Sequence, residues 1–434
     1  MATPPRRLSN PPPPTYSPSP NQDTSAAHGT ASHHLEASQA SKSQDPPLGT
    51  SASTSDPLTP AENPTRSTAS TANEQASASN APASPQNPPP AAPVITQQEH
   101  ADALHQAQTT IAPAAAEDLD SGNESSFDID SIRSLSTSLA SSALDFPFEN
   151  GRRYHKFREG RYLFPNDEVE QDREDLKHWT FMALTGQQLV LAPIGDNPQR
   201  ILDVGTGTGI WAIEAADSYP SAAVTGIDLS PIQPQWAPPN LKFLVDDCED
   251  DWLDPPDWYD YIHSRNMVQG IRSWPLYLKR ALRHIKPGGY MELQEVFHYP
   301  YQQGAPMAYA DCPLAQYWKN VIDGCGELGV DFHRPKRLAD EMRAAGFVNV
   351  EQRIYWLPIG GWAENKVLKS VGLGWKEVLT IGIQAIALGP FTRGLGWSPE
   401  AVEVFLAGVR KAYNDPSIQA SMPLYVVYGQ KPAE

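Results

Sequence analysis

The sequence predicts an α/β fold, in which helices cover both faces of a mostly parallel, doubly wound sheet that follows a long disordered N-terminal tail. Three observations predict it. The composition changes near residue 150, short apolar runs alternate with helical patterns after residue 198, and a glycine-rich loop follows the first of these runs.

The tail and the rest of the chain differ in composition. Residues 1–150 contain 21 of the 43 prolines, none of the 11 tryptophans, and 16 acidic against 5 basic side chains, a charge of −11 out of −18. A stretch so poor in aromatic residues cannot bury enough apolar surface to offset the chain entropy lost on folding. We therefore predict a disordered Ser/Pro/Ala-rich tail over 1–145, with no structure assigned over 1–126, and a folded domain over 146–434. Phe127–Leu144 has a weak apolar period that fits either a docking helix or a transient one.

The overall composition excludes several classes of protein. An acidic chain without a long basic run is a poor candidate for direct nucleic acid binding. Cys248, Cys312 and Cys325 are scattered, which excludes a disulfide framework and a zinc site with paired cysteines, so no metal site is predicted. No apolar stretch is long enough to span a bilayer. We expect an intracellular protein, cytoplasmic or nuclear, that is neither secreted nor bound to a membrane.

The elements of the domain follow from local patterns. A basic and aromatic run, Gly151–Leu163, precedes a predicted helix over Asp167–Leu191 with Asn166 as its N-cap. After Pro198, short apolar runs predict strands at Arg200–Val204, Ala223–Leu229, Leu241–Val245, Tyr259–His263 and Tyr290–Val296, separated by helices at Ile210–Ser218 and Pro275–Ile285. A helix over Pro335–Ala345, two strands over Val348–Leu357 and Leu424–Tyr428, and a helical segment between those strands complete the domain.

The loop after the first strand reads Asp203-Val-Gly-Thr-Gly-Thr-Gly209. Glycines at this place let the backbone turn sharply and approach a ligand closely. The spacing differs from a dinucleotide-binding loop, which needs a small residue where Ile210 stands, and from a phosphate-binding loop, which needs Gly-Lys-Ser/Thr.

Acidic residues end the next two strands. Asp228 stands 25 residues after Asp203, where a carboxylate can accept both hydroxyls of a ribose. Asp247 and Cys248 follow the third strand. Each of these acids alone could instead cap the helix that follows it.

These three motifs, in this order, resemble those of the class I S-adenosylmethionine-dependent methyltransferases. The resemblance is closer to the fungal LaeA-type branch, over residues 149–181, 201–220, 226–252, 262–274 and 284–295. It implies a Rossmann-like fold with a seven-stranded sheet, an N-terminal cover over 149–195, and an insertion over 358–420 that shapes the acceptor pocket. It also implies S-adenosyl-L-methionine as cofactor, bound by Asp203, Gly205, Thr206, Gly207, Gly209, Asp228, Leu229, Asp247, Cys248 and Tyr154.

The family includes small-molecule methyltransferases and nuclear regulators of secondary metabolism. The resemblance implies methyl transfer to an unidentified acceptor, most simply a small molecule of fungal secondary metabolism. The alternative is a LaeA-like regulator that acts mainly by binding protein partners, with the tail as its docking segment. Neither interpretation involves nucleic acid or a membrane.

Candidate catalytic residues are few, because methyl transfer from a sulfonium needs mainly correct placement of the acceptor. His263, at the end of the fourth strand, is the candidate general base, or else it stacks on the cofactor or ends the strand. Arg265 is the candidate ligand for a substrate carboxylate, or else it pairs with a nearby aspartate. The tryptophans of the C-terminal segment form either aromatic walls of the acceptor pocket or core: Trp356, Trp362, Trp375 and Trp397.

Overall fold

The computed structural model describes residues 95–115, 146–149, 151–158 and 160–433. The predicted weak helix over Phe127–Leu144 lies outside these residues. Within them no single helix is long and apolar enough to cross a membrane, although the bent pair Lys366–Ile381 and Ile383–Gly394 passes that test by length and composition.

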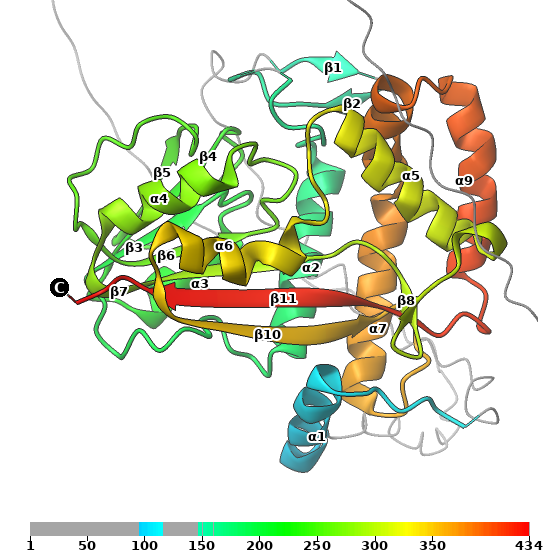
Figure 1. The fold of residues 1–434 in the computed structure, drawn as a ribbon, viewed down its shortest axis with the longest axis horizontal. Coiled ribbons are helices and arrows are strands. Elements are labelled where there is room, and N and C mark those ends of the chain that lie inside the picture. The colour runs from blue at the N-terminus through cyan, green and yellow to red at the C-terminus, as the bar shows by residue number, and fades with distance from the viewer. Residues whose placement is uncertain (1–94, 116–145, 150, 159, 434) are drawn as a thin grey trace, which may run out of the picture. The chain divides into compact units, whose positions relative to one another are not determined.

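The sheet has seven long strands in the described part of the chain (Figure 1). Five are parallel and lie in the order β5 (Leu241–Val245), β4 (Ala223–Asp228), β3 (Arg200–Val204), β6 (Tyr259–Arg265) and β7 (Ile285–Val296). The remaining two are antiparallel neighbours, β11 (Ala420–Gln430) beside β7 and β10 (Val348–Pro358) beside β11. Two-residue strands β8 (Tyr301–Gln302) and β9 (Ala305–Pro306) extend the sheet past β11, and β1 (Phe148–Glu149) pairs separately with β2 (Arg152–Arg153).

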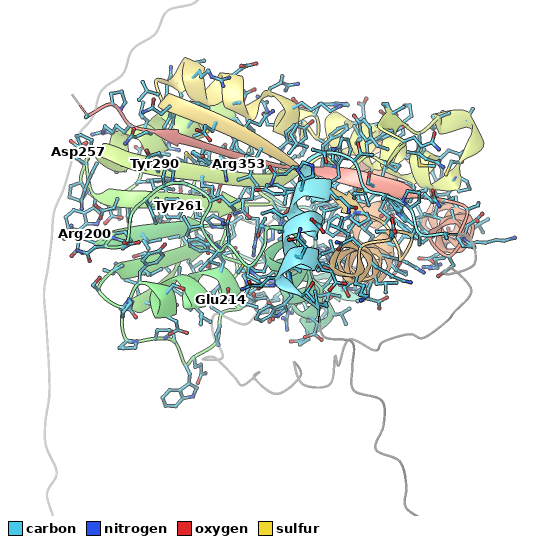
Figure 2. All side chains as sticks on the ribbon, turned by 90° about the horizontal axis from the view of Figure 1, so that it is seen from below. Arg200, Glu214, Asp257, Tyr261, Tyr290 and Arg353 are labelled. Atoms are coloured by element: carbon cyan, nitrogen blue, oxygen red, sulfur yellow. The ribbon has the colours of Figure 1, made fainter. Side chains whose placement is uncertain are left out.

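Helices cover both faces of the sheet, which confirms the predicted fold class. Figure 2 shows the layers edge on, with Glu214 of α3 (Ile210–Ser218) on one side of the strands and α6 (Leu338–Ala345) on the other. The helix α4 (Trp274–His284) packs against α6 on the second face, and α2 (Glu168–Leu184) packs against α3.

A helical lobe lies at one end of the sheet. It consists of α5 (Pro313–Glu327), α7 (Lys366–Ile381), α8 (Ile383–Leu388), a π-helical turn at Gly389–Gly394 and α9 (Pro399–Tyr413). Two 3-10 turns, at Tyr309–Asp311 and Arg334–Arg337, occur in addition to the π-helical turn. The four C-terminal tryptophans pack within this lobe and against the sheet. Trp375 is fully buried, Trp397 packs on Phe391, and the indole N–H of Trp362 donates to the carbonyl of Ala420 at 3.0 Å.

The prediction of no structure over 1–126 is wrong at Gln97–Gln108, which form the helix α1. Thr96 and Glu99 form a capping box at its start. Its buried face consists of the small side chains Ala103 and Ala107, and this is why the sequence shows no strong apolar period there. The helix is held by tertiary contacts with α7 and β10, and the backbone N–H of Ala114 donates to the Trp362 carbonyl at 2.9 Å.

The helix α2 also differs from the prediction at both ends. Its N-cap is Asp167, whose carboxylate accepts from the Glu170 N–H at 3.1 Å, whereas Asn166 donates to the Ser230 hydroxyl at 3.2 Å. The helix ends at Leu184 instead of Leu191, because Gly186 has a φ of +70° that no helix accommodates.

Because α1 packs on the domain, its removal should destabilise the protein. We expect a version that begins at residue 116 to unfold about 4–8 °C below one that begins at residue 95, since burial of Ile111 and the two alanines contributes roughly 2–3 kcal/mol. Calorimetry of the two versions tests this. In the full chain, Ala107→Asp should reproduce most of the loss and Ala101→Asp, on the exposed face, should not. Equal melting temperatures for all versions would mean that α1 contributes no stability.

Candidate functional site

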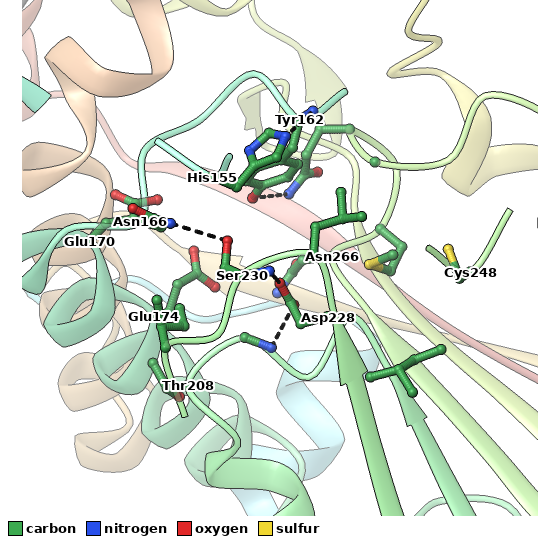
Figure 3. Close-up of a pocket in the computed structure, with 18 of the residues that line it drawn as sticks. His155, Tyr162, Asn166, Glu170, Glu174, Thr208, Asp228, Ser230, Cys248 and Asn266 are labelled. Carbon is green, nitrogen blue, oxygen red and sulfur yellow. Dashed lines mark hydrogen bonds between the residues drawn. The ribbon is translucent and has the colours of Figure 1, made fainter. Parts of the chain in front are cut away.

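A pocket opens at the carboxyl ends of β3, β4, β5 and β6 (Figure 3). The space between its walls amounts to about 930 Å³, part of which is open solvent. It lies where the strand order reverses, between β3 and β6, and open α/β sheets bind their ligands at such a point. A second, smaller cavity adjoins it beneath the glycine loop.

The three glycines of the loop have different functions, although all have positive φ. A Cβ on Gly205 would lie 2.1 Å from the Met267 sulfur, and one on Gly209 would lie 2.5 Å from the Phe243 ring. A Cβ on Gly207 would meet no atom within 4 Å. Gly205 and Gly207 line the pocket, whereas Gly209 lines neither cavity and serves the packing of the loop.

Three carboxylates hold three consecutive loop residues. The Thr206 hydroxyl donates to Asp203 at 2.6 Å, the Gly207 N–H donates to Asp228 at 2.9 Å, and the Thr208 hydroxyl donates to Asp175 at 2.6 Å. Asp203 and Thr206 line only the smaller cavity. Asp175, on α2, has no counterpart among the predicted site residues. The loop conformation therefore depends on acids from β3, β4 and α2 together.

Asp228 lies at the centre of the pocket wall. Besides the Gly207 N–H, it accepts the Ser230 N–H at 2.8 Å. Burial raises its pKa to about 6, and the two backbone donors only partly oppose this shift. Leu229, the next residue, also lines the pocket.

Asp247 and Cys248, which follow β5, line the pocket. One Asp247 oxygen accepts the Glu249 N–H at 2.9 Å, while the other has no hydrogen-bond partner among the described residues. The guanidinium of Arg161 lies 3.7 Å from that second oxygen. Burial raises the pKa of the Cys248 thiol, so the thiol is neutral.

His263 is fixed in the smaller cavity. Its Nδ1 lies 2.8 Å from Asp203, and its ring stacks on Trp211 with the ring centroids 3.8 Å apart. The side chain is only 1% exposed, and its Nε2 has no hydrogen-bond partner in the described structure.

Arg265 lines both cavities and makes no ion pair with an aspartate of the described residues. Its guanidinium donates to Nδ1 of His178 at 3.0 Å and lies over the Phe181 ring. Glu174, on α2, lines both cavities as well. Glu170 and Glu174 are spaced by one helical turn on α2, and this spacing is the only sequence signal by which they could have been found.

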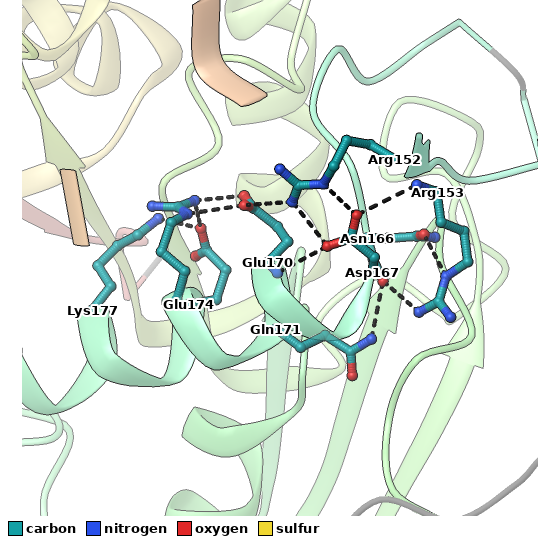
Figure 4. Close-up of polar contacts among 9 residues, drawn as sticks. Arg152, Arg153, Asn166, Asp167, Glu170, Gln171, Glu174 and Lys177 are labelled. Atoms are coloured by element: carbon teal, nitrogen blue, oxygen red, sulfur yellow. Dashed lines mark hydrogen bonds and ion pairs between the residues drawn. The ribbon is translucent and has the colours of Figure 1, made fainter. Parts of the chain in front are cut away.

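The N-terminal cover contributes His155, Tyr162 and Asn166 to the pocket. Tyr154, the predicted contact, is buried but lines neither cavity. The neighbouring arginines explain this arrangement: Arg152 pairs with Asp167 and Arg153 with Glu168, so the strand is fastened to the start of α2 (Figure 4).

The wall formed by residues 266–270 depends on a buried acid. Asn266 begins this wall with a φ of +56°, and Glu295 then accepts the N–H groups of Met267 and Val268 at 2.7 and 3.2 Å. Burial raises the pKa of Glu295 to about 8. None of the four C-terminal tryptophans lines either cavity, which favours the second predicted alternative, packing in the core: Trp375 is buried there, and Trp356, Trp362 and Trp397 are half-buried and pack against it.

Known proteins resemble this chain over most of the domain. A family model described as a methyltransferase domain matches residues 172–352. Methyltransferase pytC of Aspergillus terreus is 38% identical over 297 residues, which is 68% of this chain and 91% of that protein. Secondary metabolism regulator LAE1 of Cochliobolus heterostrophus is 35% identical over 292 residues, 66% of this chain and 95% of that protein.

A third relative is named for a protein substrate. Protein-methionine methyltransferase laeA of Emericella nidulans is 32% identical over 291 residues, which is 66% of this chain and 77% of that protein. The glycine loop and the acids at the strand ends indicate the same family as these relatives do. The chain belongs to the fungal LaeA-type family of class I methyltransferases.

Proposed function

We propose that this protein transfers a methyl group from S-adenosyl-L-methionine to a small molecule. The observation that carries the proposal is the pocket itself, in which Gly207, Asp228 and Asp247 follow the neighbouring strands β3, β4 and β5 along the carboxyl edge of the sheet. Relatives named as methyltransferases support it.

The residues present fit the cofactor. Gly207 presents open space to the pocket, as the close approach of a ligand requires. Asp228 retains lone pairs that would accept the ribose hydroxyls, and the unpartnered oxygen of Asp247 would accept the adenine amino group. The side-chain oxygen of Asn266 is another buried acceptor without a partner in the described structure.

The bound cofactor supplies a methyl group on a positively charged sulfur. The residues of the chain have to hold the acceptor in line with that methyl and exclude water, because little new charge develops in the transfer. His155, Tyr162 and Gln269 line only the larger pocket, and we assign the acceptor to their side of it. The hydrogen bond between Gln269 and the Tyr162 hydroxyl, at 3.3 Å, joins the cover to the wall.

The general-base role predicted for His263 stays a prediction. Its Nε2 is the ring atom free to take a proton. A base role requires that His263→Asn lowers turnover by about 100-fold or more, with unchanged affinity for S-adenosylhomocysteine. A loss of that affinity with little change in turnover would assign His263 to support of the loop through Asp203.

Cofactor affinity should depend on pH through Asp228. The pKa of its carboxyl is about 6 in the free protein, and donor hydroxyls bind the ionised form better. We expect the affinity for S-adenosylhomocysteine to fall by up to about tenfold per pH unit below pH 6 and to be constant between pH 7 and 8.

Folding stability should depend on pH in the opposite direction to cofactor affinity. A pKa raised above the value of 3.8 means that the folded state binds more protons, so the contribution of Asp228 to stability falls as the pH rises from about 4 to 6. Asp175 titrates in the same window, with a pKa also raised by burial to about 6. Measuring folding stability against pH in Asp228→Asn and in Asp175→Asn separates the contributions of the two carboxyl groups. A pH dependence of stability that is unchanged in Asp228→Asn would contradict the assignment of this titration to Asp228.

Methyl transfer itself can be tested with radiolabelled S-adenosylmethionine. The full chain is incubated with separate small-molecule and protein fractions of a deletion strain. We expect label in a small molecule, and no label with Asp228→Ala. Label only in protein would overturn the small-molecule acceptor and leave the methyltransferase.

The alternative role, a regulator that acts through protein partners, is favoured by the relatives named as regulators of secondary metabolism. In that case the tail serves as a docking segment, and the protein works in the nucleus or cytoplasm. Complementation of a deletion strain separates the two roles. If Gly207→Ala with Asp228→Ala restores the phenotype and a version without residues 1–94 does not, the partner-binding role is supported.

A further inference from the structure

Arg265 is the only lysine or arginine among the described residues that line the two cavities. Six carboxylates line the same cavities: Asp203, Asp228, Asp246, Asp247, Glu170 and Glu174. A single cation in an acidic pocket marks the place where a ligand presents negative charge.

The contacts of Arg265 leave most of its donors free. A guanidinium has five N–H donors, and the described structure gives Arg265 one polar partner, Nδ1 of His178 at 3.0 Å. Because arginine only donates, that nitrogen must be the unprotonated one of a neutral imidazole. The Nε2 of His178 then carries the proton and faces Glu214 at 3.1 Å. Burial lowers the pKa of His178, which keeps this ring neutral.

Glu174 lies in the same corner of the pocket and carries the opposite charge. Its Oε1 accepts from Arg173 and from Lys177, the latter at 2.6 Å. Burial opposes ionisation, but these two cations lower the pKa of Glu174 to about 2. Its Oε2 has no hydrogen-bond partner among the described residues, and the side chain is 30% exposed. Figure 4 shows Glu174 on α2 beside Lys177, and Figure 3 shows it at the edge of the pocket.

Arg265 and Glu174 lie at one end of the residues that line the pocket. Cys248 and Glu174 lie on opposite sides of Asp228 in Figure 3. Asp247 and Cys248 line only the larger pocket, whereas Glu174 and Arg265 also line the cavity beneath the glycine loop. A nucleoside whose base lies at Cys248 and whose ribose lies at Asp228 therefore directs its 5′ substituent toward Glu174 and Arg265.

We propose that Arg265 and Glu174 form a subsite for a zwitterionic α-amino acid group, in which Arg265 binds the carboxylate and Glu174 binds the ammonium. The inference rests on the proposed function, because the methionyl end of the cofactor is such a group. In this proposal Arg265 binds the carboxylate of the cofactor, instead of the substrate carboxylate that is expected from the sequence. The acceptor side of the pocket, at His155, Tyr162 and Gln269, then has no arginine or lysine in the described structure.

Three ligands with the same nucleoside separate the contributions of the two residues. S-adenosylmethionine carries both charged groups, its decarboxylated analogue carries only the ammonium, and 5′-methylthioadenosine carries neither. Their affinities are measured by calorimetry with the full chain. We expect Arg265→Gln to weaken the binding of S-adenosylmethionine by about 10- to 100-fold. The affinities for the decarboxylated analogue and for 5′-methylthioadenosine should change by less than about threefold. Glu174→Gln should weaken both ammonium-bearing ligands relative to methylthioadenosine.

Matched variants control for general damage. Arg272→Gln removes an arginine that lines neither cavity, and Asp172→Asn removes an exposed acid of α2. Both should leave all three affinities unchanged. Arg265→Lys keeps the charge but not the planar pair of donors, and should give an intermediate ratio between S-adenosylmethionine and its decarboxylated analogue. If Arg265→Gln does not fold, this ratio in Arg265→Lys decides the matter.

The outcomes distinguish the subsite from the proposed function. If Arg265→Gln lowers the affinities for all three ligands equally, or lowers none of them, the proposed subsite is overturned and the nucleoside pocket is unaffected. Failure of the wild-type protein to bind any of the three would overturn the proposed function itself.

Discussion

Asp228→Asn is expected to weaken S-adenosylhomocysteine binding by about 100-fold or more, because two hydroxyl groups of the ligand lose a charged acceptor and each such bond contributes about 1.5–3 kcal/mol. The same substitution should change the melting temperature of the ligand-free protein by no more than about 3 °C. Burial raises the pKa of this carboxyl to about 6, so its charge is unfavourable to folding at neutral pH. Removal of the charge offsets the hydrogen bonds that the Gly207 and Ser230 N–H groups lose.

Calorimetric titration and a melting curve of the same preparation measure both effects. Asp217→Asn, on the exposed end of α3, is the matched control and should change neither quantity. A large fall in melting temperature together with the loss of affinity would show that Asp228 mainly supports the loop.

Gly209→Ala and Gly207→Ala should affect different properties although the two glycines are two residues apart. Gly209 has a φ of +85°, and a Cβ there would lie 2.5 Å from the Phe243 ring. The conformation costs about 1–2 kcal/mol and the overpacking about 1–3 kcal/mol. We expect the melting temperature of Gly209→Ala to fall by about 5–12 °C.

Gly207→Ala adds a methyl group where no atom lies within 4 Å, on the pocket side of the loop. It carries only the cost of its positive φ, about 1–2 kcal/mol, so its melting temperature should fall by about 2–4 °C. Its affinity for S-adenosylhomocysteine should fall at least about tenfold, because the methyl occupies space that the ligand needs. Unchanged affinity in Gly207→Ala would mean that the ligand does not approach this glycine.

The parallel half of the fold could be predicted because its signals are local. Strands β3 and β5 and helix α3 have the expected bounds, since each is a short apolar run or a helical pattern set off by glycine or polar residues. Helix α1 could not be predicted in this way. It buries alanines, which leave no pattern, and it is stable only through contacts with α7 and β10, more than 200 positions further along the chain.

The lining of the pocket was predictable where its residues follow a strand end. Asp228, Leu229, Asp247 and Cys248 line the pocket for that reason. Glu174 lines the pocket and Asp175 accepts from Thr208 of the loop, although both residues precede the sheet in the sequence, because α2 packs across the loop. The run of basic and aromatic residues does not distinguish Tyr154 from its neighbours, and only the pairing of Arg152 with Asp167 shows which of these side chains turns inward.

The central claim is that the pocket holds S-adenosylmethionine, and titration of the wild-type full chain with S-adenosylhomocysteine tests it most directly. We expect one binding site with a dissociation constant in the micromolar range, equivalent to about −8 kcal/mol, and a higher melting temperature in the presence of the ligand. Absence of both the binding heat and the thermal shift, in a protein that is folded by circular dichroism, would contradict the account.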